Sequence, residues 1–546
     1  MILVVPAAEK GRGGGHLVRC TKLADELQAL GKDAILFDIK NKRQEKKIEL
    51  IILDRFQTPQ EELKHWKQLA PVIGIDEGGA SRDEFDFLID ILPNLEKVKP
   101  NISDIGLLPL PTKNFLTTED TEKIKVLISF GMEDSAELGE KVFDALNKVN
   151  DNRYEITFAN KDNFIPNLSE RLHEYDLVFT HFGITAFEAI YAGTQVLLIN
   201  PTKYHEKLSK KAGFKTIKKI SVPREPSVRR LRARKICNFT SKSLSKLITS
   251  FSPQINRLCP VCETVPPTKA IARFSDRTYR RCTKCGIIFM DRLTPAPIEY
   301  GKEYFFENYK KQYGKTYLED FPNLKSTAKK RLKIIKSLIP APCSLLPVLD
   351  IGCGYGAFLA AAKEEDFDPC GIDPCKEAIE YVQNELKIQA THGFFPHSPL
   401  PTPHSPLYNT ITLWFTIEHF QDCISVLAEI RKLLKPNGLL AFSTPSFSGI
   451  SGRKNRRRFL EKSPADHYTI WSPKTCKKAL SLAGFKVKKI VNCGHHPSRF
   501  PILGKLACCK YSPFFWILLV ISKLFKLGDT FEVYAVNLFE YKKNIC

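Results

Sequence analysis

The stretch Pro347-Val-Leu-Asp-Ile-Gly-Cys-Gly-Tyr-Gly356 decides the fold of the C-terminal part of this 546-residue chain. Its apolar start predicts a buried strand, its glycines predict a tight turn, and residues 357–365 predict a helix. Glycines at such a turn let a nucleoside cofactor approach backbone that side chains would block. A second predicted strand, 369–372, delivers Asp373, at the usual distance for a carboxylate that bridges two ribose hydroxyls. The stretch therefore predicts an α/β domain that binds a nucleoside cofactor.

Two later segments separate this domain from a nicotinamide-binding one, which would share the loop and the carboxylate. Residues 409–419 form an apolar strand that ends in Glu418-His419, and residues 432–440 contain a Pro-Asn-Gly turn between a helix and a strand. Both segments resemble class I S-adenosylmethionine (SAM) methyltransferases, although Asn409 stands where that class usually has Asp. The resemblance implies a SAM site made by Asp350, Gly352, Gly354, Gly356, Asp373, Trp414 and Glu418.

Two histidines are candidates for the base that takes a proton from the methyl acceptor. His419 follows the fourth predicted strand, at the edge where open α/β sheets bind ligands. His467 resembles a histidine that precedes the final helix in sugar and lipid methyltransferases. For either histidine a structural role is the alternative, and we expect Glu418 to orient SAM or His419.

A cysteine cluster precedes this domain. Cys259 and Cys262 form one Cys-x2-Cys pair, Cys282 and Cys285 form another, and 19 residues separate the pairs. Four thiolates at this spacing predict a structural Zn²⁺ with no open coordination position. A zinc module, an aromatic connector over 300–317 and a SAM domain together resemble sugar C-methyltransferases that act on nucleotide-linked keto-deoxysugars. The resemblance implies a sugar substrate and leaves carbon or oxygen methylation open.

The N-terminal part reads as two α/β halves. A strand over 2–6, a glycine run over 11–15 and a helix over 17–30 open the first half, and a strand over 124–131 opens the second. A glycine loop at a helix N-terminus favours an anion. The residues of interest are Gly13, Gly15, His16 and Arg19 in the first half and Gly131, Gly183, Thr185 and Glu188 in the second.

Across about residues 1–220 these halves resemble GT-B proteins, namely UDP-sugar hydrolases of the pseudaminic acid pathway and related surface-polysaccharide proteins. Asp76, Asp90 and Gly131 are among the matches. The resemblance implies that the glycines, Arg19, Thr185 and Glu188 contact a nucleotide-sugar, and that His16 activates water or a sugar hydroxyl. Met132 and Glu133 depart from the family pattern, so binding without catalysis is the alternative.

We therefore expect an α/β protein of several domains. Its parts are a GT-B-like pair of Rossmann domains (1–110 and 120–222), a basic linker (223–255), a zinc ribbon (256–292) and a class I SAM methyltransferase (293–546).

The formal net charge of +22 favours anionic partners. No recognisable nucleic-acid motif is present, so we expect no nucleic-acid partner. The first residues lack the features of a secretory signal, and the 16 cysteines suit a reducing cytoplasm. The apolar run 514–521 is too short to span a bilayer. It predicts a core helix, with peripheral membrane contact as the minor alternative.

The preferred hypothesis is a bifunctional enzyme of bacterial surface-sugar or polysaccharide biosynthesis. Its first unit would handle a nucleotide-activated sugar as a hydrolase, and its second would methylate a sugar at carbon or oxygen with SAM. One alternative is a glycosyltransferase fused to a methyltransferase that caps the glycan. Another is a nucleic-acid methyltransferase with a zinc ribbon, although no Asn/Asp-Pro-Pro-aromatic motif follows the fourth strand. The particular sugar and the oligomeric state are left open.

Overall fold

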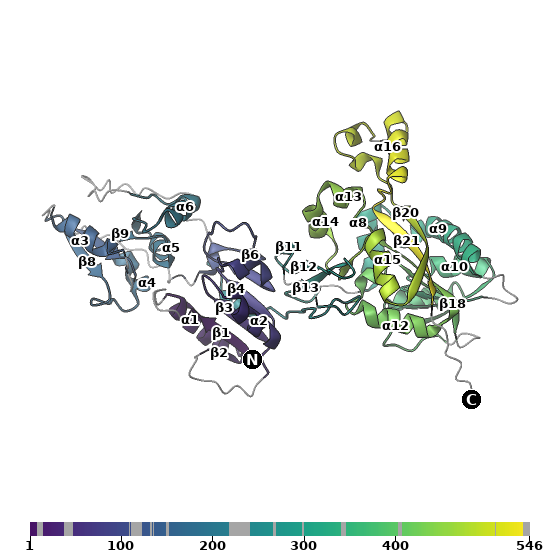
Figure 1. Cartoon of the computed structure of the whole chain (residues 1–546), viewed down its shortest axis with the longest axis horizontal. Coiled ribbons are helices and arrows are strands. Elements are labelled where there is room, and N and C mark those ends of the chain that lie inside the picture. The colour runs from purple at the N-terminus through teal and green to yellow at the C-terminus, as the bar shows by residue number, and fades with distance from the viewer. Residues whose placement is uncertain are drawn as a thin grey trace. The chain divides into compact units, whose positions relative to one another are not determined.

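The computed structural model divides the chain into two compact units (Figure 1). The first comprises residues 1–253 and 268–278, and the second comprises 254–267 and 279–546. The structure describes residues 1–7, 15–37, 47–108, 110, 123–131, 134, 136–148, 152–217, 241–265, 269–296, 300–339, 346–401, 407–507 and 509–538.

The first sheet of unit one is parallel, with strand order β2-β1-β3-β4-β5-β6. The strands are β1 (Ile2–Pro6), β2 (Ala34–Leu36), β3 (Leu50–Asp54), β4 (Val72–Ile75), β5 (Phe87–Asp90) and β6 (Ile102–Ser103). Its helices are α1 (Gly15–Ala29) and α2 (Gln60–Leu69), with short 3-10 turns η1 (Ala80–Glu84) and η2 (Ile105–Leu107). Buried Val, Ile and Leu fill β1 and β3, as a parallel sheet covered on both faces requires.

Part of the predicted linker packs on this sheet's helices. Helix α7 (Leu244–Thr249) lies against α1, and the Ser245 hydroxyl donates to Glu26 at 2.7 Å. Residues 218–240, which hold most of the basic run, lie outside the described residues. The segment 268–278, inside the predicted ribbon, also contacts this unit, because the Arg273 guanidinium donates to the carbonyl oxygens of Asp83, Phe85 and Asp86.

The second sheet of unit one is also parallel, with order β10-β9-β7-β8. Its strands are β7 (Ile124–Ser129), β8 (Tyr154–Ala159), β9 (Leu177–Thr180) and β10 (Gln195–Leu198). Its helices are α3 (Leu138–Asn147), α4 (Leu168–Arg171), α5 (Ile184–Tyr191) and α6 (Lys203–Ala212), with turn η3 (Leu172–Glu174). Unit one therefore contains two parallel α/β sheets, as the strand and helix pattern predicts.

Unit two is built on a seven-stranded sheet with order β16-β15-β14-β17-β18-β21-β20. The strands are β14 (Leu346–Ile351), β15 (Phe367–Asp373), β16 (Gln389–His392), β17 (Tyr408–Trp414), β18 (Leu434–Pro445), β20 (Phe485–Cys493) and β21 (Thr530–Asn537). β21 is antiparallel to both β18 and β20, whereas β14 to β18 are parallel. Strand order reverses between β14 and β17, which is where open α/β sheets bind ligands.

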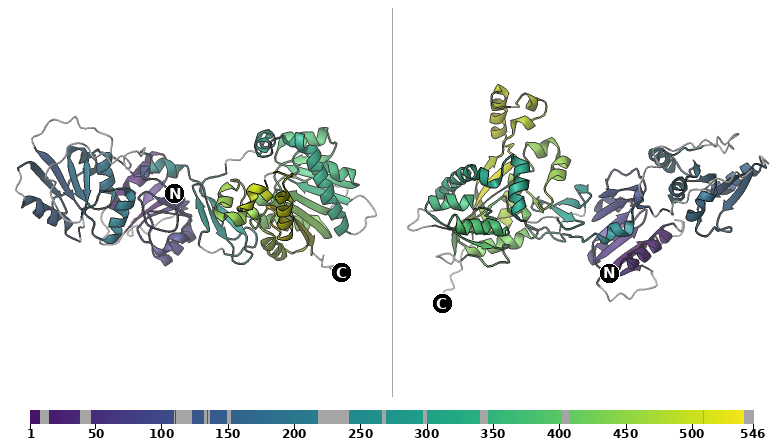
Figure 2. Two further views of the ribbon diagram at one scale, coloured as in Figure 1. Left: turned by 90° about the horizontal axis from the view of Figure 1, so that it is seen from above. Right: turned by 180° about the vertical axis from the view of Figure 1, so that it is seen from behind.

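Helices cover both faces of this sheet (Figure 2). One face packs on α9 (Tyr317–Leu338), α10 (Ala357–Glu364) and α11 (Lys376–Asn384), and the other on α12 (Cys423–Leu433) and α15 (Pro473–Leu482). The remaining helical elements are η4 (Tyr304–Asn308), α8 (Tyr309–Tyr313), η5 (Ile417–His419), α13 (Ile450–Lys454), α14 (Arg456–Lys462), η6 (Pro497–Arg499), η7 (Leu503–Leu506) and α16 (Pro513–Leu524). The result is an α/β/α sandwich with one core on each side of the sheet.

The cysteine module shares a core with the large sheet. The short strand β11 (Ala272–Phe274) belongs to unit one, and β12 (Arg277–Arg281) crosses the boundary of the two units in sequence. In unit two, β13 (Ile288–Arg292) pairs antiparallel with β19 (Thr469–Ile470). Cys259, Cys282, Cys285 and Phe289 belong to the same buried cluster as Val426 of α12. Loss of the cysteine geometry would therefore disturb the core of the main domain.

Candidate active site

The loop between β14 and α10 contains three glycines, at which the backbone carries no side chain. Gly352, Gly354 and Gly356 all have positive φ, at 76°, 50° and 76°. A Cβ on Gly352 would lie 2.5 Å from the Thr416 hydroxyl, and one on Gly354 would lie 3.0 Å from the Phe305 ring. The turn thus needs glycine both for its dihedral angles and for its space.

Two buried aspartates flank this loop with different partners. The Thr412 hydroxyl donates to Asp350 at 2.7 Å, and burial raises the pKa of Asp350 to about 7. Asp373 ends β15, and its two carboxylate oxygens accept the backbone N–H groups of Gly354 and Cys375, each at 2.8 Å. Burial raises the pKa of Asp373 to about 6. Asp350 therefore ties two strands together, while Asp373 stands at the carboxyl edge, where a ribose diol would meet it.

Aromatic rings from the predicted connector cover the glycine loop. The Phe305 ring lies 5.2 Å from that of Tyr355 and 5.3 Å from that of Tyr317. Phe305 belongs to the π-helical turn η4, and such turns are frequent at functional sites. The sequence predicts only a connector for this segment. Its density of Tyr and Phe was the signal that could have placed it in the site.

The predicted base candidates lie together. His419 Nδ1 is 2.6 Å from Asp466 Oδ2, and the Tyr300 hydroxyl donates to the same oxygen at 3.0 Å. The rings of His419 and His467 are 4.7 Å apart. Both histidines are predicted from the sequence, whereas Asp466 is not, because only the fold brings Asp466 to the end of β17.

Charges in this cluster make His419 more basic. Burial opposes the charged form of His419, but the hydrogen bond and charge of Asp466, together with Glu418, outweigh it and raise the pKa of His419. Asp466 is itself buried, yet His419 holds the pKa of this carboxyl down at about 2. Asp466 is therefore ionised at neutral pH, and its acceptance of the Nδ1 proton leaves Nε2 as the basic nitrogen.

Glu418 is a buried carboxyl with unused oxygens. Its residue is 1% exposed, and neither oxygen has a hydrogen-bond partner of normal geometry in the described part of the chain. Burial raises the pKa of Glu418 to about 7. Ligand atoms of Glu418, His419 and His467 lie within 4.8 Å of one another, a group that could hold a metal ion.

Trp414 faces the interior of the sandwich. Its ring lies 5.4 Å from that of Phe358, and the Arg331 guanidinium stacks 4.0 Å from its centre. Arg331 also donates to Glu532 at 2.7 Å. These contacts hold Trp414 in the core on the α9 side of the sheet.

The four cysteines converge as a metal site would require. Cys259 Sγ is 3.6 Å from Cys285 Sγ, and Cys262 Sγ is 3.6 Å from Cys282 Sγ. All four sulfurs lie within 4.8 Å of one another. A tetrahedral Zn²⁺ with Zn–S bonds of about 2.3 Å separates its sulfurs by about 3.8 Å. The donor set and its spacing therefore fit zinc.

A second histidine–aspartate pair lies in unit one. His16 Nδ1 is 2.8 Å from Asp54 Oδ1, and Arg19 donates to both oxygens of Asp54, at 2.5 and 2.6 Å. Arg19 also donates to Asp76 at 2.7 Å. His16, Arg19 and Asp76 are predicted from the sequence, whereas Asp54 is not. Asp54 ends β3 beside the end of β1. Of the predicted loop, Gly15 opens α1, and Gly13 lies outside the described residues.

The other residues predicted to bind a nucleotide-sugar lie on several elements of unit one. Gly131 has φ of 87°, Gly183 precedes α5, Thr185 lies in the first turn of that helix, and burial raises the pKa of Glu188 to about 7. Asp90 is a buried ion-pair partner of Arg82 at 2.7 Å, which is a structural role. Met132 and Glu133 lie outside the described residues.

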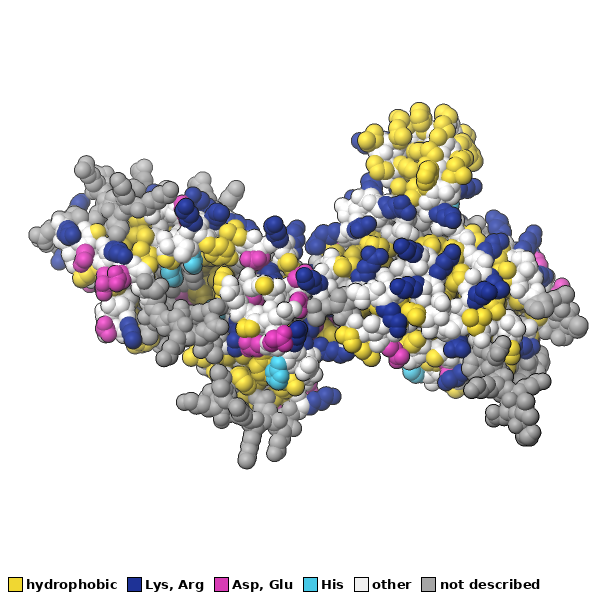
Figure 3. All heavy atoms as spheres, in the orientation of Figure 1, with side chains coloured by type: hydrophobic (Ala, Val, Ile, Leu, Met, Phe, Trp, Pro, Cys, Tyr) yellow, Lys and Arg dark blue, Asp and Glu magenta, His cyan; other side chains and the backbone are white. Residues whose placement is uncertain are grey.

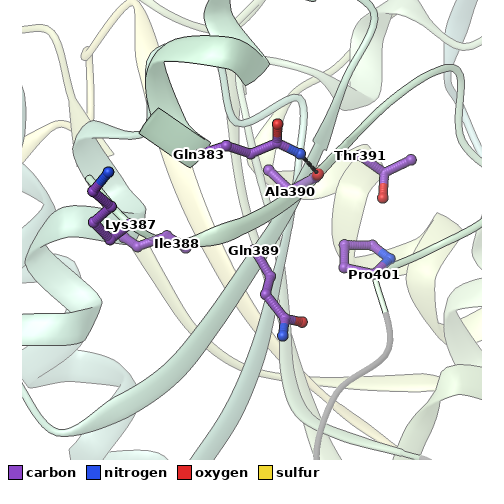
Figure 4. A pocket seen from close by; sticks show the side chains of 7 residues that line it. All are labelled: Gln383, Lys387, Ile388, Gln389, Ala390, Thr391 and Pro401. Atoms are coloured by element: carbon purple, nitrogen blue, oxygen red, sulfur yellow. Dashed lines mark hydrogen bonds between the residues drawn. The ribbon is translucent and has the colours of Figure 1, made fainter. Parts of the chain in front are cut away.

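One surface hollow lies away from these residues. This hollow has a volume of about 440 Å³ and lies along the edge strand β16. Figure 4 shows the side chains that line it, Gln383, Lys387, Ile388, Gln389, Ala390, Thr391 and Pro401. The Gln383 amide already donates to the Ala390 carbonyl at 2.7 Å. We assign this hollow no part in catalysis.

Comparisons with known proteins concern unit two. Residues 309–490 match the family model described as a methyltransferase domain. Ubiquinone biosynthesis O-methyltransferase of Acinetobacter baylyi is 26% identical over 160 residues, which is 28% of this chain and 67% of the relative. The same enzyme of Psychrobacter arcticus is 26% identical over 161 residues, 28% of this chain and 63% of the relative. The chain thus spans about two thirds of these relatives.

Solved structures similar to the chain include a SAM-dependent methyltransferase of Archaeoglobus fulgidus, at 19% identity, covering 43% of this chain and 100% of that chain with a TM-score of 0.30. Another is a possible histamine N-methyltransferase of Thermotoga maritima, at 18% identity, covering 43% and 99% with a TM-score of 0.29. The family match, together with the sheet order and the glycine loop, defines a class of protein. Unit two contains a class I SAM-dependent methyltransferase domain.

Proposed function

We propose that this methyltransferase acts on a hydroxyl group of a sugar, with His419 as the general base and Asp466 as its partner. The observation that carries the proposal is the 2.6 Å contact between His419 and Asp466 at the carboxyl end of β17. This is the edge of the sheet at which the glycine loop and Asp373 also lie. A base beside the cofactor loop suits a nucleophile that must lose a proton.

Each residue of the site would have a separate role in methyl transfer. SAM, when bound, would supply an activated methyl group on a sulfonium, and breaking the sulfur–methyl bond would leave S-adenosylhomocysteine. Gly352 and Gly354 would accommodate the cofactor's close approach, and Asp373 would accept hydrogen bonds from its ribose. Asp466 holds the Nδ1 proton of His419, so Nε2 accepts the proton of the hydroxyl while its oxygen takes the methyl group. Positioning and proton removal are the protein's main contributions to such a displacement.

Oxygen is favoured over carbon because the similar proteins named above are O-methyltransferases. A sugar acceptor is inferred from the first unit, where His16, Asp54 and Arg19 form a charged cluster at the carboxyl edge of a parallel sheet. We propose that this unit binds a nucleotide-activated sugar and that His16 activates water against it. Transfer to a second sugar, as in a glycosyltransferase, is the alternative.

We also propose that the four cysteines bind a structural Zn²⁺. We propose a reducing cytoplasm as the setting, in which these cysteines stay available to the metal as thiolates. Since four thiolates complete a tetrahedral shell, the metal would support the core and take no part in methyl transfer.

Methyl transfer from labelled SAM to a panel of UDP- and TDP-sugars tests the main proposal. We expect methylated product from the wild type, loss of product in His419→Ala, and retention of most activity in His467→Ala. Product mass and fragmentation give the methylated atom. Equal loss in both histidine variants would favour a metal site over a base, and a response to added Mg²⁺ would then confirm it. Free sugar released by the wild type but not by His16→Ala supports the first-unit proposal separately.

A further inference from the structure

Residues 494–529, the hairpin extension, form an apolar projection from unit two. The chain leaves the sheet after Cys493 and returns at Thr530, and these two residues pair directly with each other. The extension contains η6, η7 and α16, and its hydrophobic side chains gather at one end of the space-filling view (Figure 3). None of the SAM-site or cysteine-cluster residues belongs to it.

The apolar side chains of the extension point into solvent. Ile502, Tyr511 and Leu524 are 88, 97 and 72% exposed. The other exposed members are Leu503, Leu506, Phe514, Trp516, Ile517, Val520 and Phe525. On α16 the exposed positions span about half of the helix circumference, at 100° per residue. Contiguous apolar surface of this kind marks a site of interaction with a protein or a membrane.

Polar contacts hold the base of the extension in place. Arg499 donates to Asp529 at 2.6 Å and to the Ser451 hydroxyl at 3.0 Å. His495 Nδ1 lies 2.7 Å from the Ser522 hydroxyl. The Trp516 indole donates to the Lys510 carbonyl at 2.9 Å. The extension is therefore an ordered hairpin. Its polar groups form hydrogen bonds within unit two, while its apolar side chains are exposed.

The charge around this tip has one sign. Between residues 494 and 528 the sequence has Arg499, Lys505, Lys510, Lys523 and Lys526, and no Asp or Glu. The exposed basic run 453–458 of α13 and α14 adjoins the base, where Lys454 donates to the Arg499 carbonyl at 3.3 Å. An apolar tip with a basic collar matches an anionic lipid surface in both chemistry and charge.

We propose that the hairpin extension inserts its apolar tip into the interface of an anionic lipid bilayer, with the basic collar on the lipid headgroups. The 12-residue α16 is about 18 Å long, against about 30 Å for the hydrocarbon core, so it would lie in the interface. No helix among the described residues is long and apolar enough to cross a membrane. This inference stands on the extension alone and does not rest on the proposed function.

Vesicle flotation of the full chain tests the inference. We expect the protein to float with phosphatidylcholine vesicles that contain phosphatidylglycerol and to stay behind with pure phosphatidylcholine. Ile517→Glu combined with Val520→Glu should abolish flotation, since both side chains are exposed at the tip. Val265→Glu is the matched control, because Val265 is an apolar residue 71% exposed outside the extension. Replacing Lys505 and Lys523 by Gln should weaken binding about tenfold or more, at about 1 kcal/mol per charge.

Fluorescence gives a readout that reports insertion. Of the four tryptophans, Trp66 and Trp471 are buried and Trp414 is packed in the core, whereas Trp516 is 55% exposed. Brominated lipids should quench the wild type and leave Trp516→Phe unquenched. Failure to float with anionic vesicles would overturn the inference. A second contradicting outcome is a protein that binds no lipid and forms a dimer in sedimentation velocity, which Ile517→Glu/Val520→Glu disrupts. The tip would then bind a second copy of the chain.

Discussion

The two histidine–aspartate pairs of this chain share a geometry but differ in what surrounds the carboxylate. In each, a histidine that follows the carboxyl end of a parallel strand has its Nδ1 beside an aspartate, at 2.8 Å for His16–Asp54 and 2.6 Å for His419–Asp466. Asp54 also receives a bidentate guanidinium from Arg19. Among the described residues, the partners of Asp466 are His419 and the neutral Tyr300.

This difference decides what each carboxylate does for its histidine. Burial alone would raise the pKa of Asp54, but Arg19 and His16 hold it well below its usual range. A carboxylate shared with Arg19 fixes the position of His16 while its charge is largely compensated. The charge of Asp466 is compensated by His419 itself, so it raises the basicity of that ring. The comparison predicts a strong base in unit two and a positioned imidazole in unit one.

Replacement of Asp466 by Asn should give the largest effect on methyl transfer. Asp466→Asn removes the partner that orients His419, so we expect kcat for methyl transfer to fall about 1,000-fold, within the range of general-base contributions. Asp54→Asn should leave methyl transfer unchanged. A rate assay with saturating SAM measures both variants. Similar losses of kcat in Asp466→Asn and Asp54→Asn would show that Asp466 does not act as the partner of a catalytic base.

Removal of Arg19 should mainly affect stability. Arg19→Met leaves Asp54 buried and without its guanidinium, a change that costs about 3–5 kcal/mol for a buried pair. We expect the thermal unfolding transition of the first unit to move to lower temperature, with SAM binding retained. The double variant Arg19→Met/Asp54→Asn should recover part of the loss, since the charge of Asp54 is then removed and only Asp76 is left without its guanidinium partner. A transition unchanged from the wild type in Arg19→Met would contradict a compensated pair.

Cofactor binding should depend on Asp373 and not on either pair. Asp373→Ala removes the acceptor of the ribose hydroxyls, and we expect SAM affinity to fall about 100-fold, from two hydrogen bonds to a charged group. Calorimetry on the full chain measures this, with Asp368→Ala on the same strand as the matched control. Wild-type affinity in Asp373→Ala would remove Asp373 from the site.

The pH profile gives the smallest and most specific effect. His419 must be neutral to accept a proton, so activity falls as pH drops through its raised pKa. Asp466→Asn should move this acidic limb to lower pH, because the shift toward higher pKa is lost. Tyr300→Phe should move it slightly to higher pH, since Asp466 loses a competing donor. Movement of the limb in the opposite directions would exclude His419 as the titrating group.

Several elements follow from sequence alone. The strand before Gly352, its glycine turn and the strand that ends at Asp373 lie where the local pattern predicts them, as β14, the loop and β15. The predicted Pro-Asn-Gly turn between helix and strand is instead part of strand β18 (Leu434–Pro445), where Asn437 has a left-handed φ of 59°. Cys259, Cys262, Cys282 and Cys285 do converge. These features are local, because short-range periodicity, glycine conformation and ligand spacing determine them.

The partners of the functional groups were decided by tertiary structure. Asp466 lies 47 positions beyond His419, and Asp54 lies 38 beyond His16, so nothing in the local pattern of either aspartate indicates a histidine partner. The same is true of Phe305, which covers a loop far along the chain. The apolar run 514–521 predicted a core helix, and this prediction was wrong, because Trp516, Ile517 and Val520 are exposed. Whether an apolar helix is buried depends on what packs against it.

The glycine loop at Gly352–Gly356 by itself indicated a nucleoside cofactor, and residues 409–419 and 432–440 were needed to favour SAM. The cysteine spacing by itself predicted zinc, since each of these patterns depends on residue types a few positions apart. Which carboxylate serves which histidine, and which apolar helix stays outside the core, depended on strand order and packing. The fold brings segments that are far apart in the chain to one edge of a sheet. Only this proximity makes an aspartate the hydrogen-bond partner of the histidine base.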